Sequence, residues 1–179
     1  MPFWSDPQAE PKRAYRWLMF INDLPQWIIK RVDKPNFSIT ESVHTYINHN
    51  FYYPGKVEYE PIRVTLVDPV TPDAAERMMR FLSDTGYAFP DDPFDTSTIS
   101  KAGAVTALGN VEIQQLGARS EVVERITLEN AWIKSVNFGE LDYTSDDLVN
   151  IELEMRYDFF TMETIQPSFL SGLATAVGL

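Results

Sequence analysis

The side chains of this sequence that could do chemistry are mainly carboxylates, since the chain contains no cysteine and only two histidines. Glu152, Glu154 and Asp158 alternate along one predicted strand, and paired carboxylates can act as general acid and base. The same spacing is typical of any strand face in contact with water, and no pocket residue completes a catalytic set. We favour the solvated face; an enzyme or binding module that uses this acidic face is the alternative.

Metal binding has two candidate positions. His44 and His49 lack a third ligand nearby and match no compact zinc motif. Asp91, Asp92 and Asp95 offer oxygen ligands for calcium, but the spacing and the glycine of an EF-hand are missing. We interpret the histidines as packing or interface residues and the aspartates as a solvated loop, and we expect no metal and no cofactor.

The composition narrows the class of protein. The sequence has no P-loop, no dinucleotide-binding glycine pattern and no G-x-S-x-G nucleophile motif. A length of 179 residues with 44% hydrophobic residues predicts one globular domain. Without cysteine, disulfides and thiolate chemistry are excluded. We find no secretory pattern and no membrane-spanning run, so we expect a protein of a cytoplasm, or of something assembled there.

The charge argues against tight binding of nucleic acid. The net charge is −11, with 26 acidic and 15 basic residues. Binding to DNA requires Lys and Arg to neutralise phosphates. A surface past which DNA slides without sticking is compatible with this charge, and so is plain solubility.

The elements that would position these side chains are mostly strands. Apolar runs and period-two alternation predict about eight strands and one main helix, hence a mainly β fold of two packed antiparallel sheets, a sandwich or half-barrel, with one flanking helix. Ser100–Leu108 is a candidate for a second, short helix. The predicted strands are Tyr15–Ile21, Gln26–Val32, Asn36–Thr40, Val57–Leu66 with a bend at Pro61, Val111–Leu116, Val122–Glu129, Ala131–Val136 and Leu148–Phe160.

The main helix is predicted to begin at Thr71. Thr71 can cap it, Pro72 suits the first helical position, and acidic residues follow near the positive end of the dipole. Gly86 is the expected terminator. The predicted apolar stripe consists of Ala75, Met78, Met79 and Leu82.

The last predicted strand, Leu148–Phe160, has the most regular alternation in the chain. A strand of this kind, apolar on one face and charged on the other, is typical of an antiparallel sheet with one face in water. Its apolar positions are Val149, Ile151, Leu153, Met155, Tyr157 and Phe159, and its polar positions are Asn150, Glu152, Glu154, Arg156 and Asp158.

The segment His44–Pro54 is predicted to be a loop rich in aromatic side chains: Tyr46, Phe51, Tyr52 and Tyr53. In one interpretation these side chains fold back onto their own core. In the other the loop projects and packs on a neighbouring subunit, since aromatic residues are favoured at the centres of interfaces. The sequence leaves both open.

Three segments together carry a resemblance to a known family. They are YYPG at residues 52–55, VEYEPIRVTLVDP with the helix start PDAAERMM at residues 57–79, and VNFGEL at residues 136–141 before the last strand. In their order and spacing, from about Pro11 to about Glu163, they resemble the tail tube proteins of T4-type contractile phages, in the tail tube and Hcp-like superfamily.

The resemblance implies a structural subunit rather than an enzyme. Six copies would join their sheets into a hexameric β-barrel ring, and rings would stack into a hollow tube for DNA ejection. Its partners would be other copies, the tail sheath protein, the tape-measure protein and the baseplate hub, with DNA passing through and no membrane contact. The expected location is the virion tail, assembled in the cytoplasm of a bacterial host. A tube initiator, or an Hcp-like tube protein of a related injection system, is the alternative within this class.

The resemblance also assigns surfaces. The domain would span residues 13–163, between an N-terminal arm of residues 1–12 and a C-terminal arm of residues 164–179, with 44–54 projecting from it. Tyr46, Phe51, Tyr52 and Tyr53 would stack one ring on the next. Glu152, Glu154 and Asp158 would line the lumen and repel DNA phosphates.

Overall fold

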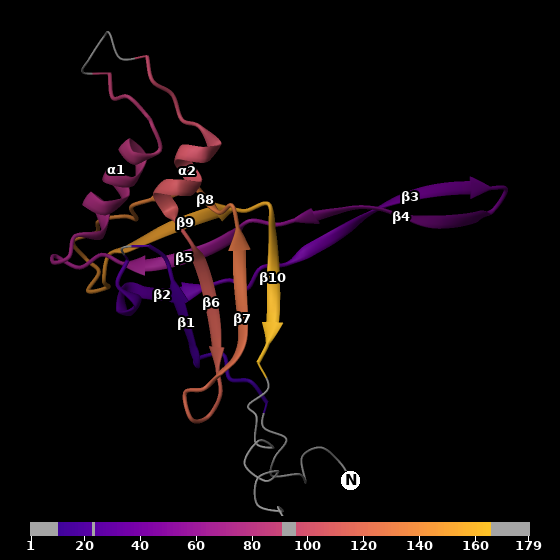
Figure 1. Ribbon diagram of the computed structural model, residues 1–179, viewed down its shortest axis with the longest axis horizontal. Helices are drawn as coiled ribbons and strands as arrows, with labels where there is room; N and C mark the ends of the chain where they lie inside the picture. Colours follow the sequence, from indigo (N-terminus) through magenta and orange to yellow (C-terminus); the bar gives the residue numbers. More distant parts are fainter. Residues whose placement is uncertain (1–10, 23, 91–95, 166–179) are drawn as a thin grey trace, which may run out of the picture.

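The computed structural model describes residues 11–22, 24–90 and 96–165. Two four-stranded antiparallel sheets form the body of the protein, and a long two-stranded ribbon extends away from it (Figure 1). The predicted mainly β fold is confirmed, and the sheets do not close into a barrel within one subunit. The strand orders are β1-β6-β7-β10 and β2-β5-β9-β8. The bounds are β1 Trp17–Phe20, β2 Ile29–Val32, β3 Phe37–Tyr46, β4 His49–Tyr59, β5 Ile62–Val67, β6 Val111–Leu116, β7 Val122–Glu129, β8 Trp132–Asn137, β9 Asn150–Arg156 and β10 Phe159–Thr164.

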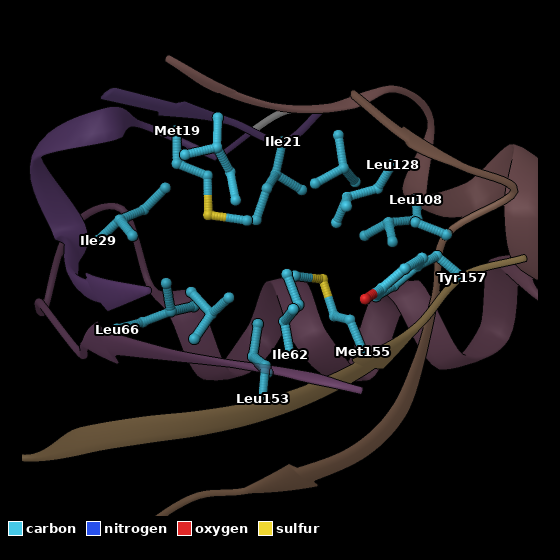
Figure 2. Packing of buried hydrophobic residues seen from close by; sticks show 14 of the residues in the cluster. Met19, Ile21, Ile29, Ile62, Leu66, Leu108, Leu128, Leu153, Met155 and Tyr157 are labelled. Carbon is cyan, nitrogen blue, oxygen red and sulfur yellow. The ribbon is translucent and has the colours of Figure 1, made fainter. Parts of the chain in front are cut away.

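The core lies between the two sheets. Figure 2 shows Met19 and Leu128 from one sheet pointing toward Ile62 and Met155 from the other. Alternation places these side chains, since successive residues of a strand point to opposite faces. Along β5, Ile62, Val64 and Leu66 are buried, as expected for a strand that begins a new phase after Pro61.

In the described part of the chain two helices flank the sandwich, so the candidate short helix at Ser100–Leu108 is confirmed in addition to the main helix. Helix α1 spans Ala74–Asp84 and α2 spans Lys101–Leu108, where Ser100 Oγ accepts a hydrogen bond from Gly103 N at 3.0 Å as the N-cap. A short 3-10 helix, η2, spans Gln26–Ile28 and replaces the first half of the strand predicted at Gln26–Val32.

The predicted start of α1 was wrong. The N-cap is Asp73, whose Oδ1 accepts from Glu76 N at 2.9 Å, while Thr71 and Pro72 precede the helix and are joined by a cis peptide bond. The apolar stripe is also rotated. Of the predicted positions, Met78 is buried and Ala75 packs against the core, but Met79 is 46% exposed, and Ala74 and Phe81 complete the stripe instead. Gly86, at φ +96°, follows the helix end as predicted.

The predicted strand Leu148–Phe160 is in fact two strands in different sheets. β9 ends at Arg156 and pairs with β5 and β8, whereas β10 begins at Phe159 and pairs with β7. The chain therefore crosses from one sheet to the other at Tyr157 and Asp158. The alternation changes phase there, since Tyr157 is buried but Phe159 is 45% exposed.

Candidate assembly surfaces

The ribbon β3–β4 is the most prominent surface feature of the chain. It is an antiparallel hairpin that runs from Phe37 to Tyr59 and projects from the sandwich (Figure 1). The segment predicted as the loop His44–Pro54 is therefore mostly paired strand, and the short strand predicted at Asn36–Thr40 continues to Tyr46. The turn lies at Ile47 and Asn48, where Ile47 adopts φ +53°.

The other described residues of the subunit cover neither face of this hairpin. All side chains from Phe37 to Glu58 are exposed, including the four predicted aromatic residues, which keep between 49% and 63% of their surface in water. The aromatic side chains thus do not fold back onto the core. A long ribbon with open edges and exposed aromatic side chains is a surface that favours association with another chain.

The pairing register separates the four aromatic residues. Tyr53 lies opposite Ser42, and Phe51 opposite His44. Because directly opposed residues share a face, Tyr46, Phe51 and Tyr53 lie on one face of the ribbon. Tyr52 lies on the other face, opposite Val43. The hairpin therefore offers aromatic contacts in two opposite directions.

The base of the hairpin is fixed to the sandwich by aromatic packing. Tyr59 contacts Tyr157 and Phe160, with ring centroids 6.1 Å and 5.7 Å apart, and Phe37 lies 6.5 Å from Phe160. In addition, Arg156 donates from Nη1 to the carbonyl oxygen of Tyr59 at 3.1 Å. These contacts set the direction in which the hairpin leaves the body.

A buried carboxylate, which we did not single out in the sequence, adds to this anchoring. Glu124 on β7 is only 4% exposed and accepts hydrogen bonds from Lys12 and from Lys34, the latter at 2.6 Å. Burial alone would raise the pKa of this carboxyl, but the two lysines outweigh burial and lower it. The sequence did hold a signal, since Glu124 is in phase with the buried Ile126 and Leu128.

The two histidines lie on the same face of the hairpin as Phe51. His44 is opposite Phe51, and His49 is opposite Tyr46. Among the described residues, no three His, Asp or Glu side chains gather closely enough to hold a metal ion. The candidate calcium ligands Asp91, Asp92 and Asp95 lie outside the described residues.

The three carboxylates of the candidate lumen do not form one row. Glu152 and Glu154 lie on β9 and point away from the core, opposite Thr65 and Arg63 of β5. Asp158 lies at the crossing between the sheets and accepts from Lys101 Nζ at 2.6 Å and from Asn130 Nδ2 at 2.8 Å. The contacts from Lys101 and then Asn130 lower the pKa of Asp158.

The outer face of the sheet β2-β5-β9-β8 carries both signs of charge. Glu154 accepts from Lys134 Nζ at 2.7 Å, and this bond, with the nearby Arg63 and Arg156, lowers its pKa. The sequence predicted this face to be acidic, but basic side chains outnumber the two glutamates on it. The register and contacts place five basic side chains there: Lys30, Arg31, Arg63, Lys134 and Arg156.

None of the described helices has the length and apolar content that crossing a membrane requires. The sequence matches no family model and no curated protein.

Comparison with solved structures shows where this fold occurs. A chain in the cryo-EM structure of the anti-feeding prophage baseplate, 6-fold symmetrised, is 19% identical, with a TM-score of 0.62 over 88% of this chain and 99% of that chain. A chain in the structure of the anti-feeding prophage tube terminating cap is 18% identical, with a TM-score of 0.62 over 92% of this chain and 100% of that chain.

A third similar chain belongs to the PVC sheath-tube complex of an extracellular contractile injection system in its extended state. It is 18% identical, with a TM-score of 0.57 over 87% of this chain and 93% of that chain. At these identities the shared property is the fold. The comparisons therefore confirm, at the level of fold, the resemblance to tail tube proteins.

Proposed function

We propose that this chain is the structural subunit of the tube of a contractile injection system, in which hexameric rings stack into a hollow conduit. The observation that carries the proposal is the projecting hairpin β3–β4, which exposes aromatic side chains on both faces. A monomer gains nothing from such a surface, whereas a neighbouring subunit would bury it. The fold similarity to chains of contractile assemblies supports the same conclusion.

The two sheets supply the second element of the assembly. Within the described residues, each sheet has two edge strands with one open side, β1 and β10 in one sheet and β2 and β8 in the other. Joining opposite edges of successive copies satisfies the unpaired backbone groups and produces a heterologous contact. Such a contact closes into a ring when the rotation fits, and the hairpin would then connect one ring to the next.

The channel wall in this proposal is the outer face of β2-β5-β9-β8. Glu152 and Glu154 would oppose the phosphates of passing DNA, and the surrounding cations would weaken that repulsion. A wall of mixed sign holds a polyanion only weakly, which suits passage during ejection from a phage tail. Asp158, paired with Lys101, would contribute little to the field in the channel.

The assembly would form in a bacterial cytoplasm and become part of a virion tail, with sheath, tape-measure and baseplate proteins as partners. The alternatives in the same class are a tube initiator and an Hcp-like tube protein. An enzyme or binding module that uses the acidic face is disfavoured, since that face carries more cations than carboxylates.

Negative-stain electron microscopy and native mass spectrometry of the purified full chain test the proposal. Hollow tubes or stacked six-fold rings are the expected result. Closed rings that never stack favour the initiator. A monomer or dimer at every concentration, with and without a crowding agent, overturns the tube proposal.

A further inference from the structure

A groove runs along the open side of the sandwich, between the edge strands β1 and β2. Trp17, Leu18 and Met19 line it from one sheet, and Ile29 and Val32 line it from the other. Two exposed cations, Lys30 and Arg31, also line it, and Arg31 Nη2 lies 3.5 Å from Asp33 Oδ1. It is therefore an apolar groove with two basic side chains on a strongly acidic protein.

A second surface of the opposite charge lies at the other edge of the same sheet. The stretch from residue 138 to residue 148, which follows β8 and which we term the acidic loop, is exposed throughout. Tyr143 is fully exposed, and Leu141 and Leu148 keep 85% and 67% of their surface in water. The stretch contains no Lys or Arg, and its acidic residues are Glu140, Asp142, Asp146 and Asp147.

The acidic loop has a defined shape although it is exposed. Asp142 accepts hydrogen bonds from both N and Oγ1 of Thr144 at 2.8 Å, and the bond from the backbone is the main reason that its pKa is lowered. Gly139, at φ +80°, donates from N to Asn137 Oδ1 at 3.1 Å. A preformed loop loses little conformational freedom on binding, so its apolar side chains are prepared for a partner.

We infer that the acidic loop of one copy docks in the β1–β2 groove of a second copy. The apolar side chains around Tyr143 would enter the groove, and Glu140 and Asp146 would approach Lys30 and Arg31. The loop and the groove are complementary in charge and in apolar surface. This complementarity favours a second copy of the chain over a different protein that lacks such a loop.

The placement of the two surfaces also favours a second copy. In the strand order β2-β5-β9-β8, the groove lies at the first strand and the acidic loop at the last. One copy can therefore donate its loop to a neighbour and receive a loop on its opposite side, which is the geometry of a head-to-tail ring or filament. This inference rests on the proposed function and adds to it the residues that select the neighbour.

Cysteine crosslinking tests the contact directly, because the chain has no cysteine of its own. Tyr143→Cys and Gln26→Cys variants, the second at an exposed position of the groove, are mixed and mildly oxidised. A disulfide-linked heterodimer is expected at about ten times the yield of a Tyr143→Cys and Val70→Cys mixture. Val70 is a matched control, 95% exposed and outside the groove. Equal yields of the two heterodimers overturn the inference. It is also overturned if the cysteine at position 26 of the monomer does not react with a thiol reagent because terminal segments of the same chain cover the groove.

Charge reversal separates this inference from the proposed function. The Glu140→Lys/Asp146→Lys variant and the Lys30→Glu/Arg31→Glu variant should each assemble at least about tenfold more weakly than wild type. An equal mixture should recover, because each reversed loop then meets a reversed groove and each unchanged loop an unchanged groove. Tubes formed normally by both variants overturn this interface and leave the tube proposal intact, whereas wild-type protein that never assembles overturns both.

Discussion

Lys34 Nζ lies 2.6 Å from Glu124 Oε1, and this ion pair connects the segment before the projecting hairpin to a central strand of the sandwich. The other carboxylate oxygen of Glu124 accepts from Lys12, in the segment that precedes β1. The glutamate side chain is 5% exposed, whereas both lysines are about half exposed. One buried carboxylate therefore holds two peripheral segments, each of which leads to a surface that we assign to assembly.

Glu124→Gln should lower the free energy of unfolding of the subunit by about 1–3 kcal/mol. The neutral amide cannot balance the charge of the two ammonium groups. The loss of stability should be smaller than for a fully buried ion pair, because both lysines reach water. Urea unfolding measures it. Glu163→Gln is the matched control, since Glu163 is 68% exposed and lies 3.9 Å from Arg125; equal losses for both variants would contradict the assignment.

The same carboxyl predicts a pH dependence. The pKa of Glu124 is lower in the folded protein than the ordinary value of a glutamate carboxyl, because Lys12 and Lys34 outweigh the effect of burial. Such a group stabilises the fold above its unfolded pKa, and the stabilisation disappears as pH falls through the folded pKa. The difference in unfolding free energy between wild type and Glu124→Gln should thus be constant from about pH 7 to about pH 5 and shrink below about pH 4. A difference that stays unchanged at acidic pH would be inconsistent with a lowered pKa.

The aromatic side chains of the hairpin should matter for assembly and not for folding. A triple substitution of Tyr46, Phe51 and Tyr53 by serine removes the aromatic residues of one face, and Tyr52→Ser changes the other. Each variant should unfold within about 1 kcal/mol of wild type, since these side chains are exposed, while stacking into tubes is lost in the triple variant. Electron microscopy and urea unfolding measure the two effects.

Ile99→Ser is the control for the hairpin variants, because Ile99 is 52% exposed and lies outside the hairpin. It should leave stacking unchanged. Tubes of normal length from the triple variant would show that this face of the hairpin does not join rings.

The sequence predicted those elements whose pattern is local. β6 and β7 have the predicted bounds, because strict alternation between turns fixes both ends of a half-buried strand. The prediction failed where contacts between distant parts of the chain determine the end of a strand. The alternation of Leu148–Phe160 continues through Arg156, and only pairing with two different sheets separates β9 from β10.

The surfaces were harder to predict than the strands. The four aromatic residues of the hairpin are visible in the sequence, but their division between two faces follows from the strand pairing of Tyr46 with His49 and of Phe51 with His44, in a segment that the sequence predicted to be a loop. Likewise, β9 reveals Glu152 and Glu154, whereas the cations beside them come from β2, β5 and β8. The charge of a sheet face depends on long-range pairing.

Reversing the two glutamates of the candidate channel wall should slow the passage of DNA. Glu152→Lys/Glu154→Lys leaves only cations among the charged side chains of β5, β8 and β9 on this face, so phosphates would bind the wall during ejection. Tubes should still assemble, and genome release should fall several-fold, most strongly at low salt. Glu163→Lys, on the other sheet, is the control. Normal release by the double variant would exclude this face as the channel wall.

Gly139 should be required for the shape of the acidic loop. It adopts φ +80°, and a Cβ at this position would lie 2.6 Å from the carbonyl oxygen of Asn150. Gly139→Ala is therefore expected to cost about 1–3 kcal/mol, either as lost stability or as a displaced loop. Gly117→Ala is the control, because its added Cβ meets only the flexible side chain of Glu121. If the loop docks on a second copy, Gly139→Ala should also reduce the Tyr143→Cys and Gln26→Cys crosslink more than Gly117→Ala does. Equal crosslinking, together with an unchanged midpoint of urea unfolding, would show that the backbone at Gly139 constrains neither the loop nor its docking.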